Sequence, residues 1–341
     1  MDKFLQQEDQ LGLRINTAAT ELYGKLRALD PDALGMPAYC LNYYKASHSR
    51  RLFFSIETSA SLLYRAVRLL NRIPEDLVVM DYGGGVGSLY LLAKMIGFKQ
   101  VIYNDHLEDW KISAELIAQA IGIHIDHYIV GDIDDCFERL EKFNIHCDLI
   151  TSRNVIEHIY QLDVFYQQVH ERQPNAVVYS STTANIKNPL SVIKHKRWHH
   201  KWENVYRGKR GVVIERQCPG LTPAKMNNLA VKTRGLANDE LAVAIENYRK
   251  RGTLPNPAKH KTNTCDPSTG VWAEHLLSLD EYKELIGEAN FDVTFEPGFW
   301  DTHYPSAIKN RAAHFVNRLI AKNPSSGMKL APFIYVIARP R

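Results

Sequence analysis

A glycine-rich turn near residue 80 carries the clearest chemical signal in the sequence. Residues 78–97 read VVMDYGGGVGSLYLLAKMIG, in which an apolar run leads to Asp81 and then to Gly83, Gly85 and Gly87. Glycines let the backbone approach a ligand closely, and the start of the apolar helical pattern after the turn presents free amide groups. A strand that ends in such a turn and opens a helix is typical of a nucleotide-type binding site.

Two classes of ligand compete for this turn. A dinucleotide needs its pyrophosphate over the pattern GxGxxG, which Gly83, Gly85 and Ser88 fit only with serine in the third place. S-adenosylmethionine (SAM) carries a sulfonium cation and an amino-acid end instead, and an acid such as Asp81 suits that charge. The stretch DYGGGVG fits the form DxGxGxG in full. We therefore expect SAM as the cofactor, with a dinucleotide oxidoreductase as a more distant alternative.

On this motif the sequence resembles the class I SAM-dependent methyltransferases, over roughly residues 74–183 and 276–341. The resemblance implies that the acid ending the second strand, Asp105, binds the ribose hydroxyls. A simpler role stays open, because Asp105 could cap the helix that starts near Glu108. The resemblance also implies that Asp132 lies beside the adenine amino group, although it could instead be a turn residue.

The same resemblance extends to the rest of the cofactor pocket. It implies that Ile133 stacks on the adenine ring. The stretch CDLITSRNVIEHI resembles the fourth strand of the family and the turn after that strand, and implies that Arg153 and Asn154 face the methionine end of the cofactor.

Methyl transfer to a hydroxyl requires alignment and removal of a proton, so a base should lie across the cofactor. Neutral histidine is the commonest base near pH 7. The candidates are His199 and His200, in the stretch IKHKRWHHKW that also holds His195, and His158. His158 could equally be an ordinary residue at a turn.

The stretch that holds His158 is also a candidate metal site. Some relatives, the small-RNA 2′-O-methyltransferases and the ubiquinone-pathway O-methyltransferases, show E-x-x-E-H here and bind a divalent metal. This chain keeps Glu157 and His158 but has Asn154 in place of the first glutamate. Losing a carboxylate weakens a hard-cation site, so we expect no metal.

Strand and helix patterns alternate around these residues. Apolar strands are expected at 76–82, 100–105, 125–132, 147–154 and 175–183, with helices between them, and two more strands at 292–297 and 331–340. Buried strands separated by helices predict an α/β fold: a doubly wound, mostly parallel, seven-stranded sheet of Rossmann-like methyltransferase type. Ser278 and Glu281 form a capping-box pattern for the helix before the sixth strand.

The chain divides into four expected parts. Residues 1–73 form a helical N-terminal cap, 74–183 the SAM-binding core, 184–275 a basic insertion, and 276–341 the completion of the sheet. The insertion holds 17 Lys or Arg against 7 Asp or Glu, while the remainder holds 25 against 31. This asymmetry indicates an anionic partner, or else a solvated basic surface. We expect the insertion to form an acceptor-binding lid, joined at the mouth by loop and cap residues: Tyr43, Tyr44, His48, His275, Trp300 and His303.

The composition predicts the cellular location of the protein. No run of 18 apolar residues occurs, so we expect no membrane span, and the start of the chain does not resemble a secretion signal. Five scattered cysteines without a CxxC pair indicate reduced thiols in a cytoplasmic protein.

The expected function is transfer of a methyl group from SAM to an oxygen of a sugar, a nucleotide-linked sugar or another polar anionic small molecule. One alternative is a metal-assisted RNA ribose 2′-O-methyltransferase, and RNA remains a possible partner. A second alternative is a non-catalytic protein that keeps the SAM fold.

Overall fold

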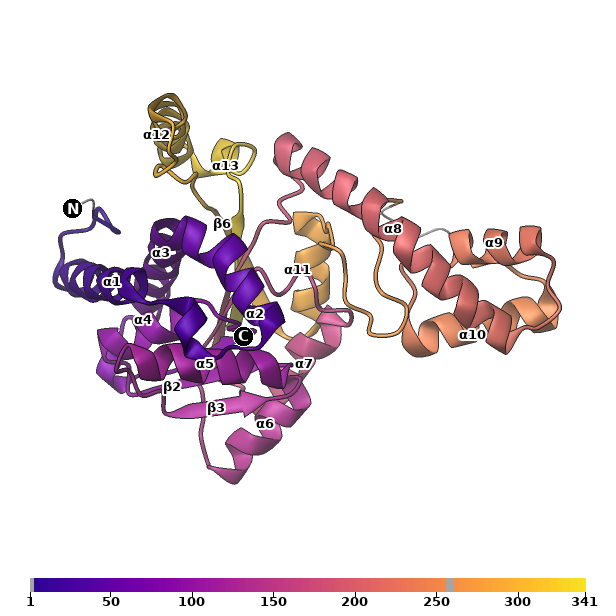
Figure 1. Cartoon of the computed structure of the whole chain (residues 1–341), viewed down its shortest axis with the longest axis horizontal. Helices are drawn as coiled ribbons and strands as arrows, with labels where there is room; N and C mark the ends of the chain where they lie inside the picture. The colour runs from indigo at the N-terminus through magenta and orange to yellow at the C-terminus, as the bar shows by residue number, and fades with distance from the viewer. Residues whose placement is uncertain (1–2, 256–260) are drawn as a thin grey trace.

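A single seven-stranded sheet organises the protein. The computed structural model describes residues 3–255 and 261–341 (Figure 1). In it the strands follow the order β3-β2-β1-β4-β5-β7-β6. The strands are β1 (Val78–Tyr82), β2 (Gln100–Asp105), β3 (His127–Val130), β4 (Leu149–Arg153), β5 (Val177–Thr182), β6 (Phe291–Pro297) and β7 (Ile334–Pro340). The predicted α/β fold with a seven-stranded sheet is confirmed.

Strands β1 to β5 are parallel, and β7 runs antiparallel between β5 and β6. The chain therefore reverses its order between β1 and β4, which places a switch point at the carboxyl ends of these strands. Ligands of open α/β sheets bind in the crevice at such a point. Asp81, Asp105 and Arg153 lie at or next to the carboxyl ends of β1, β2 and β4.

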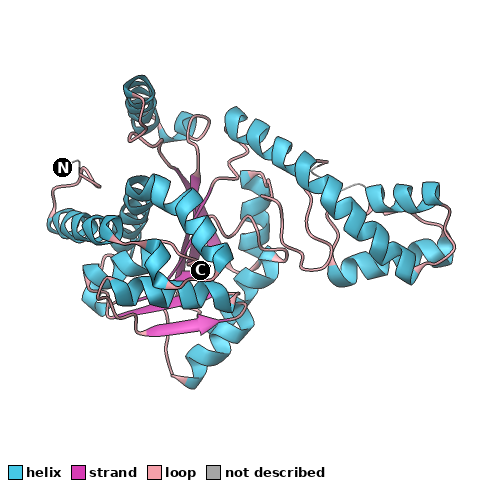
Figure 2. Ribbon diagram, viewed as in Figure 1, coloured by secondary structure: helices cyan, strands magenta, loops and turns pink. Residues whose placement is uncertain are grey.

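Helices cover both faces of the sheet (Figure 2). One buried cluster joins one face to α1 (Gln10–Ala28), α3 (Leu52–Leu70), α4 (Leu89–Ile96) and α5 (Glu108–Ala120). A second cluster joins the other face to α6 (Ile133–Lys142), α7 (Leu162–Arg172) and α11 (Leu279–Glu288). The predicted capping box at the start of α11 is present, with Ser278 and Glu281 exchanging hydrogen bonds.

The N-terminal region packs against the sheet rather than standing apart. Between α1 and α3 lie α2 (Ala38–Tyr43) and three short helical turns: η1 (Pro31–Leu34), η2 (Tyr44–His48) and η3 (Ser49–Arg51). The turn η2 has π-helical geometry, which often occurs at functional sites. A fourth turn, η4 (Pro74–Asp76), leads into β1.

The insertion contains long helices where the sequence showed no regular pattern. They are α8 (Pro189–Gln217), α9 (Pro223–Lys232) and α10 (Asn238–Arg251), and they extend away from the sheet (Figure 1). The residues of α8 that are buried are mostly polar, and a polar buried face gives no hydrophobic periodicity to recognise. We call α8, α9 and α10 together the arm.

The C-terminal region adds two helices that were not predicted, α12 (Ala307–Lys322) and α13 (Pro324–Gly327), between β6 and β7. Within the described residues, no helix is long and apolar enough to cross a bilayer. All five cysteines are buried free thiols.

Candidate active site

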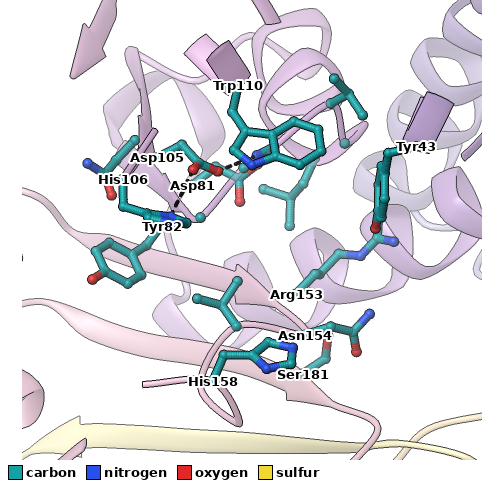
Figure 3. A pocket seen from close by; sticks show the side chains of 18 of the residues that line it. Tyr43, Asp81, Tyr82, Asp105, His106, Trp110, Arg153, Asn154, His158 and Ser181 are labelled. Atoms are coloured by element: carbon teal, nitrogen blue, oxygen red, sulfur yellow. Dashed lines mark hydrogen bonds and ion pairs between the residues drawn. The ribbon is translucent and has the colours of Figure 1, made fainter. Parts of the chain in front are cut away.

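A cavity of about 680 Å³ opens at the carboxyl edge of the sheet. Its walls come from the ends of β1, β2, β4 and β5, from α3 and η2, and from the loop that returns from the arm. Such a volume lies within the usual range for small-molecule sites. In Figure 3, Asp81, Asp105 and Trp110 lie on one side of the cavity, and Asn154, His158 and Ser181 on the other.

The glycine turn forms the floor beside β1, and Gly83, Gly85 and Gly87 all line the cavity. Gly83 has a φ of 70°, and an added Cβ would lie 2.6 Å from Val155 Cγ2. Gly85 has a φ of 50°, and an added Cβ there would meet nothing within 4 Å. The first glycine is therefore required by packing, whereas the second leaves open space above the backbone for a ligand.

Two buried carboxylates flank this turn. Asp81 is 2% exposed and accepts a hydrogen bond from Tyr90 N at 3.1 Å. Burial raises the pKa of Asp81 to about 7, although the charge of Arg153 opposes the rise. Two buried acids that face a cavity favour a cationic or hydroxyl-rich ligand.

Asp105 holds the turn and still faces the cavity. Its Oδ2 accepts from Gly85 N at 2.9 Å, and its Oδ1 accepts from Leu107 N at 3.4 Å. Helix α5 begins without a side-chain cap, so Asp105 is not the cap of that helix. A hydrogen bond to Asp105 raises the pKa of the neighbouring His106, which also lines the cavity.

Arg153 brings a positive charge to the same cavity. Its guanidinium donates to Ser55 O at 2.7 Å and to the hydroxyl of Ser59, both on α3. Among the residues that the structure describes, no carboxylate forms an ion pair with Arg153. Its charge is therefore available to an anionic group of a ligand.

Asn154 follows Arg153 in a left-handed conformation, with φ 56°. Its backbone N donates to Ser181 O at 2.8 Å, which continues the pairing of β4 with β5 by one residue. The Asn154 residue is exposed and lines the cavity. The structure thus brings both residues predicted for the methionine end to one cavity.

Of the two residues after β3 that were predicted to contact adenine, only one lies at the cavity. Asp132 lines the cavity, and it also caps α6 by accepting from Asp134 N at 3.0 Å and Asp135 N at 3.1 Å. Ile133, in contrast, packs in the core beneath the sheet and does not line the cavity. The expected stacking of Ile133 on a ring does not fit this placement, because the first turn of α6 directs the side chain inward.

Three aromatic residues also line the cavity, and two of them were not predicted from the sequence. Trp110 of α5 meets the rings of Tyr39 and Tyr43 edge-on, with centroids 5.4 and 5.2 Å away. All three line the cavity. Of these three, only Tyr43 was expected at the mouth. The available signal for Trp110 was its position in the first turn of the helix after β2.

The three predicted catalytic histidines are separated in the structure. His158 lines the cavity, and its Nδ1 lies 2.8 Å from Trp272 O, so Nδ1 carries the proton and Nε2 keeps its lone pair. His199 is buried and its Nε2 donates to Glu274 O at 2.8 Å. His200 is exposed on α8. Neither His199 nor His200 lines the cavity, which argues against a direct role for either as the base.

Of the other residues expected at the mouth, Tyr43 and His48 line the cavity. Burial and the charge of Arg153 lower the pKa of His48 to about 3, so its ring is neutral near pH 7. Four of the expected residues do not line the cavity. Tyr44 is buried, and Trp300 forms hydrogen bonds with Leu330 O and with Asn317. His275 stacks on Trp272, and His303 packs on Phe53.

A group of side chains of metal-ligating type lies next to His158 at the wall of the cavity. Glu157, His158 and Glu274 each offer one ligand atom, and these atoms lie within 4.8 Å of one another. Burial raises the pKa of Glu157 to about 7, with His158 lowering it and Glu274 raising it. The sequence had placed Glu157 and His158 together but gave no role to Glu274, although the acid stands beside His275 in the stretch WAEH.

No protein-family model matches the chain, and no curated protein matches it either. Among solved structures, the chain is similar to a SAM-dependent methyltransferase from Mesorhizobium loti, at 14% identity and a TM-score of 0.39, over 82% of this chain and 97% of that one.

Two further solved structures are similar over most of the chain. One is a SAM-dependent methyltransferase from Archaeoglobus fulgidus, at 15% identity and a TM-score of 0.39, over 89% of this chain and 100% of that one. The other is magnesium protoporphyrin IX methyltransferase from Synechocystis PCC 6803 with bound SAH, at 11% identity and a TM-score of 0.39, over 88% and 97%.

Proposed function

We propose that this protein is a SAM-dependent methyltransferase that methylates an oxygen of a polar anionic small molecule, such as a sugar or a nucleotide-linked sugar. The observation that carries the proposal is the charge pattern at the strand ends. Two buried carboxylates, Asp81 and Asp105, and one partly buried guanidinium, Arg153, surround a glycine turn with open space above it.

The groups of SAM match this pattern one by one. Arg153 is suited to the methionine carboxylate, because no described carboxylate pairs with it. Asp105 uses only part of its acceptor capacity on backbone amides, so its remaining lone pairs suit the ribose hydroxyls. Asp81 supplies negative charge near the cationic sulfur and ammonium groups.

A dinucleotide fits the same cavity poorly. Its pyrophosphate would bring two negative charges over the glycine turn, between the carboxylates of Asp81 and Asp105. Like charges that lose water repel strongly at short range. The acids therefore favour the cationic cofactor.

When bound, SAM supplies an electrophilic methyl group on a cationic sulfur. Transfer of that methyl group from sulfur to the acceptor oxygen would release the hydroxyl proton, and His158 or solvent would accept it. The protein residues align the two reactants and exclude water. Of the three predicted histidines, His158 is the one placed to act on the acceptor hydroxyl, through the lone pair on Nε2.

The acceptor would lie between the cap and the loop that returns from the arm. Arg51 and His48 line this part from the N-terminal region, and Thr269 and Val271 line it from the loop. We propose that residues 184–275 contribute to acceptor binding through this loop. Buried free thiols suit a reducing setting such as the cytoplasm.

One observation favours RNA as a second candidate acceptor. On the exposed side of α8, Trp198 and Trp202 stand among lysines, and Lys194 Nζ lies 5.4 Å from the Trp198 ring centre. Aromatic rings with cations can stack on bases. Binding of RNA would weaken steeply as salt rises, whereas binding of a small acceptor would change little.

Calorimetric titration with SAM tests the proposal. We expect saturable binding to the wild type and a loss on the order of 2 kcal/mol in Asp105→Asn, about 30-fold in Kd, because a charged acceptor for the ribose is removed. Glu108→Gln changes an exposed acid a few residues away and should bind normally. Equal affinity in Asp105→Asn and the wild type, with both folded by circular dichroism, would refute the placement of the ribose.

A turnover assay separates an enzyme from a non-catalytic binding protein. The protein would be incubated with SAM and nucleotide sugars, phosphorylated sugars or short RNAs, and the demethylated cofactor measured. Release that depends on one acceptor class supports catalysis and names that class. Tight SAM binding without release for any acceptor would instead support the non-catalytic alternative.

A further inference from the structure

We propose that Glu157, His158 and Glu274, joined by His195, form a binding site for a divalent cation beside the acceptor end of the cavity. The inference rests on the proposed function and changes the role of His158 there: a cation bound to Nε2 would take the lone pair that otherwise accepts the hydroxyl proton, and the cation would act on the acceptor oxygen in place of the ring. It also replaces the sequence-based expectation that no metal takes part.

The four side chains come from three distant segments. The ligand atoms of Glu157, His158 and Glu274 lie within 4.8 Å of one another. His195 of α8 extends the group, with its Nε2 3.5 Å from Glu274 Oε2. The three converging side chains, with His195 next to Glu274, offer two carboxylates and two imidazoles, which are ligand types that proteins use for transition-metal ions.

Backbone pairing holds Glu274 against the other two ligands. His275 N donates to Glu157 O at 2.8 Å, and Trp272 N donates to His158 O at 3.2 Å. The segment 272–275 therefore runs beside residues 157–158, and its Glu274 lies between the two hydrogen bonds.

Thr183 links the two carboxylates to the cavity. Its backbone N lies 3.3 Å from Glu157 Oε1, and its hydroxyl lies 3.3 Å from Glu274 Oε2. Thr183 and His158 both line the cavity. A cation held by this group would thus lie just behind the cavity wall, where the acceptor hydroxyl is proposed to bind.

Several polar atoms in the group are buried without partners. Glu157 is 0% exposed and its Oε2 has no hydrogen-bond partner among the described residues. His195 is also 0% exposed, and neither of its ring nitrogens has a hydrogen-bond partner within the same part of the chain. Burying such atoms without partners is costly, and one cation would satisfy Glu157 Oε2 together with one of the two His195 nitrogens.

The negative charges of the two carboxylates also favour a bound cation. In the part of the chain that the structure describes, no lysine or arginine forms an ion pair with Glu157 or Glu274. Two neighbouring buried carboxylates without a positive partner are unfavourable when ionised. A divalent ion would neutralise both.

The histidine at the cavity wall is oriented as a ligand. Its Nδ1–H donates to Trp272 O at 2.8 Å, which leaves the Nε2 lone pair for a metal. Metal-bound histidines usually donate their other ring N–H to a carbonyl or carboxylate in this way. Mixed nitrogen and oxygen ligands favour Mn²⁺, Fe²⁺, Co²⁺ or Zn²⁺ over Ca²⁺ and Mg²⁺, which prefer oxygen alone.

Titration of the chelator-treated full-length protein with Mn²⁺, followed by the electron paramagnetic resonance signal of the free ion, tests the site. We expect one Mn²⁺ to bind per chain, and Glu274→Gln and His195→Gln each to weaken binding at least about tenfold. The matched controls are Glu215→Gln and His314→Gln, which change exposed residues elsewhere and should bind like the wild type. No saturable binding, or variants that bind as well as the wild type, would overturn the inference.

Two further measurements keep the outcome clear. Circular dichroism checks that each variant is folded. If Glu274→Gln does not fold, His195→Gln alone tests the cation site. Calorimetry with SAM on the same chelator-treated samples separates the two proposals. SAM binding without Mn²⁺ binding refutes the cation site alone, while Mn²⁺ binding without SAM binding refutes the proposed cofactor and leaves the cation site standing.

Discussion

Glu57 is an acid whose surroundings should make the stability of the protein depend on pH. It lies on α3, and its buried Oε2 has no hydrogen-bond partner among the described residues. Burial raises its pKa from 4.5 to about 8, and the charge of Asp301 adds to the rise. Between these two pH values the folded protein holds a proton that the unfolded chain releases.

The free energy of unfolding should therefore fall as pH rises through that window, by up to about 1.4 kcal/mol per pH unit from this group. Glu57→Gln has no proton to release at this position, so we expect its decline between pH 5 and pH 8 to be less steep than that of the wild type. Urea unfolding at both pH values measures the effect. Glu284→Gln, at an exposed position of α11, should keep the wild-type slope. If both variants decline alike, Glu57 is ionised in the folded protein near pH 7.

Residues of the candidate site were predictable where sheet geometry alone brings them together. Asp81, Asp105 and Arg153 end or follow parallel strands, whose carboxyl ends meet at one edge. Glu274 was not predictable in the same way. It reaches Glu157 only because the returning loop pairs with the backbone there, and Glu274 itself takes a φ of 62°. No pattern in the sequence specifies such a pairing.

At the scale of an element, α6 begins with a residue that has two possible roles. Asp132 caps the helix and also lines the cavity. Two substitutions separate the roles. Serine is a good N-cap but carries no charge. Alanine can neither cap the helix nor accept a hydrogen bond.

We expect Asp132→Ala to lower the free energy of unfolding by about 1 kcal/mol and Asp132→Ser to leave it nearly unchanged, because only alanine removes the cap. If Asp132 also contacts the adenine of SAM, both variants should bind SAM more weakly by a similar factor. Urea unfolding and calorimetry measure the two effects. Normal SAM affinity in both variants would leave Asp132 with the capping role alone.

Helix α8 explains why the insertion was not recognised as helical. Its buried side runs through Ser191, His195, His199, Glu203 and Arg210, spaced by about one or two turns. The buried Arg210 pairs with Glu203, which also accepts from Thr264. Hydrophobic periodicity is the main sequence signal of an amphipathic helix, and a helix that buries polar residues lacks it. Most strands of the sheet, in contrast, carry runs of buried apolar residues, and the strands were predicted within a few residues of their bounds.

Across the whole molecule, the described residues form separate cores. Two large clusters lie on the two faces of the sheet, and a third, smaller cluster joins the far end of α8 to α9 and α10. In Figure 1 this end of the arm lies far from the strands. The cavity is built on the sheet. The arm meets it through the loop that holds Thr269, Val271 and Glu274, and through cavity-lining Tyr160, whose hydroxyl donates to Glu240 of α10. Loosening the far end of the arm should therefore leave cofactor binding intact.

Leu241→Ala tests this separation. Leu241 is 1% exposed in the small core, and removing its side chain should cost about 3 kcal/mol of local stability. Because the described residues of that core lie in the arm and in the loops next to its helices, we expect faster amide hydrogen exchange in α9, α10 and the end of α8, with unchanged protection in β1 and β4 and unchanged affinity for SAM. Val243→Ala, on the same helix but 60% exposed, should change neither. Mass spectrometry of exchange and calorimetry give both readouts. If exchange in β1 rises together with that in α10, the arm and the sheet unfold as one unit, and the arm helps to support the cavity.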